Sequence, residues 1–242
     1  MIPATHLSRM GIYDVTIGGV EVKARVIDDG KLINAALAEL ELTEEENPIV
    51  GLDLKQCRNV FGRRRCAAVI LCTNDKCLII QLDRMMRGAG GFKNRRNRRR
   101  IPRILGDFLS ERRVCFVSPN GFEKRVHGLS FPDTARVAKS GPCCGARSSP
   151  RLFKCKEIHA VEVGNYAARV LKKPELLKCK SLEKLGSEAG VDLNSSGCYG
   201  GNGVKAKRPK WDSEIFSEEE VLYVMHDAVA CYRIVHKLLH QI

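Results

Sequence analysis

The chain has 242 residues, of which 44% are hydrophobic, enough to build the core of one well-packed domain. Lysine and arginine number 41 against 28 acidic residues, and the formal net charge of +13 favours nucleic acid as a partner, with a generic basic surface as the alternative. No run of about 18 apolar residues occurs, which argues against a membrane partner.

The first part of the chain has the pattern of a β-hairpin followed by a helix. Residues 12–17 and 20–26 alternate apolar and polar side chains, and a Gly-Gly pair between them is typical of a tight hairpin turn. Residues 31–42 place apolar side chains at helical spacing. We expect residues 1–46 to pack on a main domain that comprises residues 47–242.

The central feature of the main domain is the apolar run at residues 48–55. It predicts a buried central strand that brings Asp53 to the edge of a sheet, where the carboxylate needs a partner because an unpaired buried charge is costly. Residues 66–72 and 77–82 then flank the turn-forming tetrad at residues 73–76. They predict a second hairpin that is buried on both faces.

A glycine-rich and strongly basic stretch follows at residues 84–103. Its like charges and lack of apolar residues predict an exposed loop. Three interpretations are open: an arm that contacts phosphates, a nuclear localisation signal, or a solvated insertion without function. The candidate nucleic-acid contacts are Arg95, Arg96, Arg98, Arg99 and Arg100.

The second half of the chain alternates short elements with irregular segments. A buried strand is predicted at residues 114–117, whereas residues 121–129 offer little helical periodicity. Segments 131–156 and 192–210 are rich in residues that favour loops. Helices are expected at residues 102–110, 166–171 and 181–189.

The cysteines indicate free thiols rather than a disulfide framework. Their number, eleven, is odd, several lie in apolar runs, and no signal peptide precedes them, so we expect a reducing compartment, the nucleus or cytoplasm. Cys143, Cys144 and Cys155 could suggest zinc. However, the chain contains no Cys-x-x-Cys pair, which argues against a structural metal.

The last segment has the clearest helical signal. Residues 217–220 form a capping box, and apolar side chains keep helical spacing from there to the end of the chain. Tyr223 and Asp227 are four residues apart and therefore share one face of this helix. A strand aspartate, a helix aspartate and a tyrosine one turn before it could form the frame of a two-metal phosphodiesterase site.

Several of these motifs together resemble the Werner-syndrome-type 3'-5' exonuclease domain, in particular its plant relatives. They are the strand at 49–53, the hairpin strand at 77–82, the pair Trp211-Asp212, and the helix from Ser217 with its Tyr-x-x-x-Asp. The resemblance runs with gaps from about Tyr13 to the C-terminus. It implies a ribonuclease H-like α/β fold of the DEDDy class, with a mixed five-stranded sheet flanked by helices and, here, an N-terminal β-hairpin extension. It also implies cleavage from 3' ends with two divalent ions, Mg²⁺ or Mn²⁺.

The residues match the family pattern only in part. Asp53 corresponds to the first metal-binding acid, Asp227 to the last, and Tyr223 to the tyrosine that orients the attacking water. Lys55 stands where the family has a metal-binding Glu, and strand residues two apart share a face, so its ammonium should point into the site. The segment that should carry the third acid is several residues short, and Glu123 is the only nearby carboxylate.

The charges of these residues decide which function we expect. Two divalent ions need several anionic oxygens, and a lysine between two aspartates would pair with both in place of a metal. We therefore expect an exonuclease-like domain that binds single-stranded nucleic acid or 3' ends, with weak or no catalysis. The alternative is an active metal-dependent 3'-5' exonuclease whose Glu123 or substrate phosphates complete a metal site, and the third candidate is a protein-interaction domain. Under a purely structural interpretation, Asp53, Lys55 and Asp227 form an ion-paired cluster. The oligomeric state stays open.

Overall fold

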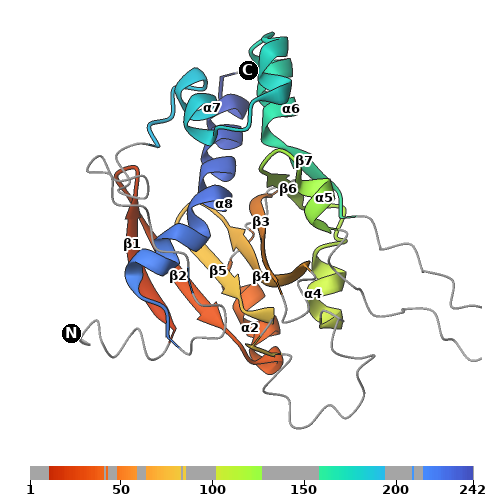
Figure 1. The fold of residues 1–242 in the computed structure, drawn as a ribbon, viewed down its shortest axis with the longest axis vertical. Helices are drawn as coiled ribbons and strands as arrows, with labels where there is room; N and C mark the ends of the chain where they lie inside the picture. Colours follow the sequence, from red (N-terminus) through yellow and green to blue (C-terminus); the bar gives the residue numbers. More distant parts are fainter. Residues whose placement is uncertain are drawn as a thin grey trace, which may run out of the picture.

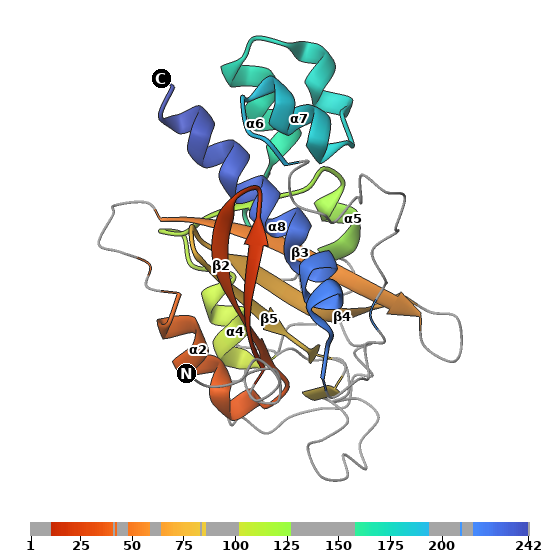
Figure 2. The same ribbon diagram turned by 90° about the vertical axis from the view of Figure 1, so that its left-hand side faces the viewer.

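The computed structural model describes residues 11–40, 42, 48–58, 64–82, 84–85, 102–126, 158–193, 209 and 215–241. These residues contain a single mixed sheet with helices on both of its faces (Figure 1 and Figure 2). The strands are β1 (Ile12–Ile17), β2 (Val20–Ile27), β3 (Ile49–Arg58), β4 (Arg64–Cys72), β5 (Lys76–Ile80), β6 (Cys115–Ser118) and β7 (Ala160–Glu162).

Short helices surround one long helix. The short ones are η1 (Gly30–Leu32), α2 (Ile33–Ala38), α4 (Arg103–Phe108), α5 (Phe122–Val126), α6 (Val163–Val170), η3 (Pro174–Lys178) and α7 (Leu182–Glu188). The long one is α8 (Glu218–Leu239), whose N-terminus has the predicted capping box between Ser217 and Glu220. None of the helices in the described ranges is long and apolar enough to cross a membrane.

The sheet has the strand order β1-β2-β5-β4-β3-β6-β7. Within it, β4 is antiparallel to both β3 and β5, whereas β3, β6 and β7 are mutually parallel. These five strands form the mixed sheet that the sequence predicts, and the predicted α/β class is confirmed. The sheet has seven strands rather than five because the N-terminal hairpin joins it, with β2 pairing in parallel with β5.

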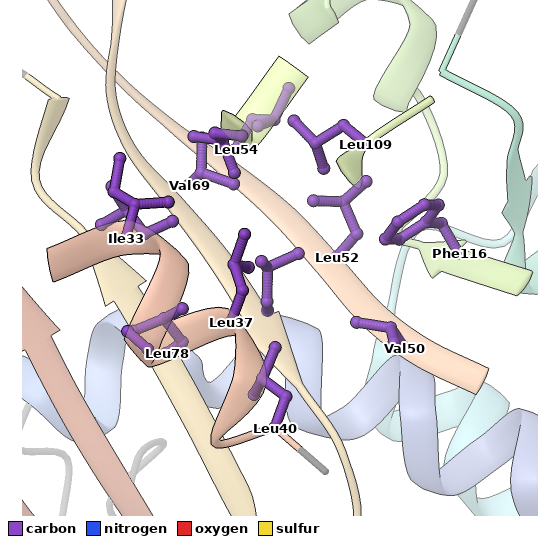
Figure 3. Packing of buried hydrophobic residues seen from close by; sticks show 14 of the residues in the cluster. Ile33, Leu37, Leu40, Val50, Leu52, Leu54, Val69, Leu78, Leu109 and Phe116 are labelled. Atoms are coloured by element: carbon purple, nitrogen blue, oxygen red, sulfur yellow. The ribbon is translucent and has the colours of Figure 1, made fainter. Parts of the chain in front are cut away.

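The core of the molecule lies on both faces of β3. Leu52 and Leu54 point toward α2 and α4 and pack in one apolar cluster with Ile33, Leu37 and Phe116 (Figure 3). Because side chains alternate along a strand, Asp53 and Lys55 point to the opposite face, which α8 covers. The sequence of β3 therefore places an apolar layer on one side and two charged residues under α8 on the other.

A close approach of backbones brings α8 down onto β3. A Cβ atom added at Gly51 would lie only 2.1 Å from the carbonyl oxygen of Ala228, so no larger residue fits at this position without moving the helix. Gly51 thus sets the distance between β3 and α8. It lies two residues before Asp53, and Ala228, which it faces, directly follows Asp227.

Most of the predicted elements are confirmed, including both hairpins, the central strand and the helices α4, α6, α7 and α8. The helix predicted at residues 31–42 is shorter, because a 3-10 turn precedes α2, which ends at Ala38. The strand β7 and the 3-10 helix η3 were not predicted.

Two predictions about the site region are wrong. Asp53 lies in the middle of β3 rather than at a sheet edge, because the strand continues to Arg58 and keeps pairing with β4. The segment after Asn120 is helical over α5, although its own sequence has little periodicity. A long-range contact supplies the cap: Glu162 Oε1 accepts the N–H groups of Gly121 and Phe122 at 2.8 and 3.1 Å.

Several other predictions concern segments outside the described residues. These are most of the basic stretch 84–103, the loops 131–156 and 192–210 for the most part, the Trp211-Asp212 pair and the cysteines Cys143, Cys144 and Cys155. The division of the chain at residue 46 also stays a prediction.

Candidate functional site

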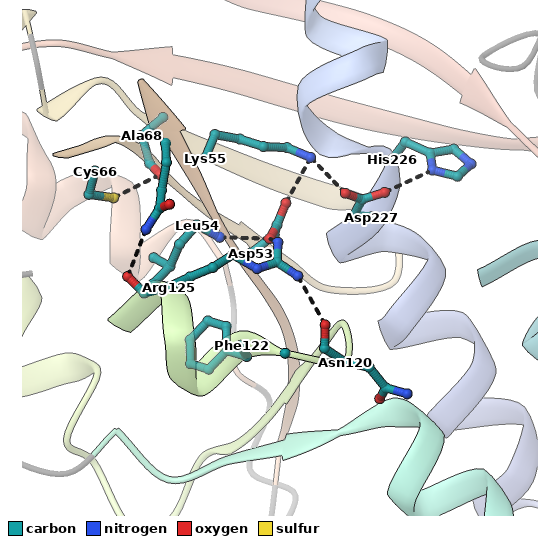
Figure 4. A network of polar contacts seen from close by, with 12 residues as sticks. Asp53, Leu54, Lys55, Cys66, Ala68, Asn120, Phe122, Arg125, His226 and Asp227 are labelled. Carbon is teal, nitrogen blue, oxygen red and sulfur yellow. Dashed lines mark hydrogen bonds and ion pairs between the residues drawn. The ribbon is translucent and has the colours of Figure 1, made fainter. Parts of the chain in front are cut away.

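The strand β3 and the helices α5 and α8 bring four charged side chains together (Figure 4). Lys55 Nζ lies 2.8 Å from Asp53 Oδ2 and 2.7 Å from Asp227 Oδ2. Arg125 Nη1 donates a hydrogen bond to Asp53 Oδ1 at 2.6 Å. The predicted contact of Lys55 with both aspartates is thus confirmed, and Arg125 joins the cluster without having been predicted.

Asp53 is the centre of the cluster and is completely buried, with 0% of its side chain exposed. Its Oδ1 also accepts the backbone N–H of Leu54 at 2.8 Å. The contact of Oδ2 with Lys55 is an ion pair without hydrogen-bond geometry, whereas Lys55 donates a proper hydrogen bond to Asp227. Both oxygens of this buried carboxylate therefore face a protein cation, as a buried charge requires.

Mutual attraction keeps Lys55 and Asp227 charged. Burial by itself would lower the pKa of Lys55, but the carboxylates of Asp53 and Asp227 outweigh it and raise that pKa above its ordinary value of 10.5. Burial would raise the pKa of Asp227, but the hydrogen bond from His226 and the charge of Lys55 lower it below its ordinary value of 3.8. Since arginine is always protonated, two cations balance two carboxylates at neutral pH.

Tyr223 and Asp227 face Lys55 from α8, as their spacing predicts. The Lys55 ammonium lies 5.5 Å from the centre of the Tyr223 ring, a distance at which a cation and an aromatic face attract each other. His226 is buried beside them, and its Nδ1 lies 3.4 Å from Asp227 Oδ1. The tyrosine thus contacts the lysine cation of the cluster.

The structure does not place every residue that the sequence singles out. The backbone of Glu123 belongs to α5, but its side chain is outside the described residues, as are Arg95, Arg96, Arg98, Arg99 and Arg100. Their proposed roles stay predictions. Arg125 was missed although a signal existed: Phe122 and Val126 form an apolar i,i+4 pair that contacts the core, and this pair indicates one helical turn.

The side chains that meet here do not fit a pair of divalent metal ions. Two ions about 3.5–4 Å apart need several anionic oxygens within about 2.0–2.6 Å. Only Asp53 and Asp227 supply carboxylates in the described part of the site, and each already contacts a cation at 2.6–2.8 Å. Across the described ranges, no group of three or more His, Cys, Asp and Glu side chains is arranged to hold a metal.

No protein-family model matches the chain, and no curated protein matches it either. Solved structures do resemble it. Brucella melitensis NrnC has 13% identity, covers 90% of this chain and 78% of its own, and gives a TM-score of 0.49. The EXD2 exonuclease domain has 15% identity over 91% of this chain and 95% of its own, with a TM-score of 0.39.

A third similar structure is Escherichia coli RNase D, described as an exoribonuclease involved in structured RNA processing. It has 14% identity, covers 90% of this chain and 44% of its own, and gives a TM-score of 0.48. NrnC has also been solved bound to pGG and with bound Mg²⁺. Identities of this size with TM-scores below 0.5 support no functional conclusion for this chain, so its function has to be argued from its own site.

Proposed function

We propose that this chain is a nucleic-acid-binding domain with a 3'-5' exonuclease-like fold and with weak or no metal-dependent hydrolysis. The observation that carries the proposal is the position of the Lys55 ammonium, 2.8 Å from Asp53 and 2.7 Å from Asp227. These two aspartates are the acids that the Werner-type resemblance assigns to metal binding, and a protein cation already neutralises them.

Hydrolysis by two metal ions depends on ions that activate a water molecule and stabilise the leaving oxygen. Lys55 does not activate water, because its ammonium is buried between two carboxylates that raise its pKa and keep it protonated. It therefore cannot act as a general base at neutral pH. Any divalent ion that approached Asp53 would also be repelled by Arg125.

The partner follows from the charge of the whole chain. A formal net charge of +13 attracts polyanions, and binding through phosphates releases condensed counterions, so the affinity should fall steeply with salt. We propose single-stranded nucleic acid or 3' ends as the ligand, because the Werner-type resemblance of the sequence implies a domain that acts on 3' ends.

Two measurements on one oligonucleotide test this function. Fluorescence anisotropy of a 3'-labelled single strand should show binding whose affinity drops on the order of tenfold or more between 50 and 200 mM salt. Gel analysis of the same strand with Mg²⁺ or Mn²⁺ should show no nucleotide release beyond that of the Asp53→Asn variant.

Each of the other outcomes has a definite meaning. Metal-dependent release that Asp53→Asn abolishes would show that the chain is an active exonuclease. An absence of salt-dependent binding would leave the domain with a role in protein interaction. Either result contradicts the proposal.

A further inference from the structure

We infer that Lys55 and Arg125 together take the structural place of the two divalent ions, so that the chain's own cations hold α5 and α8 on β3. The inference rests on the proposed absence of metal-dependent hydrolysis and goes beyond it, because it gives Lys55 and Arg125 the role of holding the two helices on the strand. It also predicts that each of the two cations prevents metal binding on its own.

The first of these contacts joins β3 to α8. Lys55 on the strand contacts Asp227 on the helix at 2.7 Å and is only 13% exposed. Its other neighbour, Asp53, is on the same strand and fully buried. One ammonium therefore connects the strand and the helix through the two acids that would hold a metal ion in the Werner-type family.

The second bond joins β3 to α5 through the other oxygen of the same aspartate. Arg125 Nη1 donates to Asp53 Oδ1 at 2.6 Å, and its Nη2 contacts the carbonyl oxygen of Asn120 at 3.5 Å. The backbone carbonyl of Arg125 in turn accepts a hydrogen bond from Gln56 Nε2 on β3 at 3.1 Å. Asp53 thus holds one protein cation on each of its two oxygens.

Arg125 is held in position more firmly than an ordinary surface arginine. Its side chain is 26% exposed, but its partner is not exposed at all, so solvent screens the pair weakly. Asn120, which accepts from Arg125, is itself fixed: its side-chain oxygen accepts from Gly164 N at 3.0 Å. A guanidinium that contacts a side chain and a backbone carbonyl at once has a defined orientation.

The two cations should block metal binding independently. With Lys55→Glu alone, a third carboxylate enters the site, but Arg125 still occupies one oxygen of Asp53. With Arg125→Gln alone, Lys55 still neutralises both aspartates. Only the double variant presents three carboxylates without a competing cation, so Mn²⁺ affinity should appear in the double variant and exceed the sum of the two single effects.

Thermal unfolding of the full chain with and without Mn²⁺, together with electron paramagnetic resonance of the free ion, tests this inference. We expect no Mn²⁺-dependent change in Tm for the wild type and a small change for each single variant. The Tm of Lys55→Glu/Arg125→Gln should rise by roughly 5 °C or more when the Mn²⁺ concentration is about 100-fold above the Kd of this variant. The free-ion signal should fall clearly with the double variant, only slightly with each single variant, and not with the wild type. EDTA should leave the Tm of the wild type unchanged.

A matched control separates site effects from overall charge. Lys31→Glu/Arg103→Gln makes the same change in charge at exposed positions, since Lys31 is exposed and the Arg103 side chain is 77% exposed. This control should bind no Mn²⁺. If the double site variant is unfolded in buffer, Mn²⁺ should refold it, and failure to do so overturns the inference.

Other results also have distinct meanings. If the wild type or either single variant responds to Mn²⁺ as strongly as the double variant does, the inference is overturned. Metal-dependent cleavage by the wild type would refute the proposed function directly. The wild type could also bind nucleic acid without cleaving it while the double variant binds no Mn²⁺. The proposed function would then stand, and the inference that the two cations take the place of metal ions would be wrong.

Discussion

Replacing Lys55 by methionine removes the ammonium from the centre of the cluster while keeping a side chain of similar length. Asp53 would stay fully buried with Arg125 as its only cation, and Asp227 would lose its ion pair. The variant should therefore fold less stably than the wild type, because Asp227 loses the cation of Lys55 and the buried Asp53 keeps only that of Arg125.

The size of this loss follows from the burial of the groups. Breaking a fully buried ion pair by removing one partner costs about 3–5 kcal/mol. Here Arg125 still neutralises Asp53, and Asp227 is 27% exposed and can be hydrated again. We therefore expect the free energy of unfolding to fall by about 2–4 kcal/mol, which corresponds to a decrease in Tm of about 5–12 °C for a chain of this size.

The pH dependence identifies the groups that are responsible. The folded-state pKa of Asp227 is lowered, so its contribution is present above the ordinary value of 3.8 and is lost as the pH falls through the folded value. The pKa of Lys55 is raised, so its contribution is present below 10.5 and is lost as the pH rises through the folded value. The difference in stability between wild type and Lys55→Met should thus be largest and constant between these limits, and should shrink outside them.

Urea denaturation followed by far-UV circular dichroism, repeated between pH 3 and pH 11, measures this difference. Lys23→Met on the exposed side of β2 serves as the control and should change the free energy of unfolding by less than about 0.5 kcal/mol. If Lys55→Met is as stable as this control, or if its deficit does not depend on pH, the ion-pair reasoning is refuted.

Three further variants test the packing and the helix ends by the same unfolding measurement. Gly51→Ala places a Cβ 2.1 Å from the carbonyl oxygen of Ala228 and should lower the free energy of unfolding by about 1–3 kcal/mol. The control Gly30→Ala, whose nearest contact would be at 3.6 Å, should leave the stability nearly unchanged. Equal effects of the two variants would contradict the close approach of α8 to β3. Ser217→Ala removes the side-chain cap of α8 and should cost about 1 kcal/mol, and no loss would mean that this helix end needs no cap. Lys172 has a φ of 55°, so Lys172→Gly should stabilise by about 0.5–1 kcal/mol; a loss would argue against the left-handed conformation.

The parts of the site that the sequence predicts are those that depend on local periodicity. Side chains two apart on a strand share a face, so Lys55 had to accompany Asp53. Side chains four apart on a helix share a face, so Tyr223 and Asp227 had to point the same way. That the strand aspartate and the helix aspartate belong to one site is implied by the Werner-type resemblance rather than by these local patterns.

The parts that the sequence does not predict depend on contacts between distant residues. The helix α5 begins where Glu162, 41 residues away from Gly121, accepts its N–H, and no local pattern reveals that cap. The apolar pair Phe122 and Val126 indicates one helical turn, but it does not show that Arg125 contacts Asp53. The pairing of β2 with β5 likewise joins residues about fifty apart, and alternation along a strand says nothing about which neighbour it pairs with.

Anomalous scattering from crystals soaked in Mn²⁺ tests most directly whether the chain's own cations fill the site. The account predicts no manganese peak between Asp53 and Asp227, with the Lys55 ammonium in contact with both carboxylates. Two manganese peaks beside these aspartates, with Lys55 turned away, would contradict it.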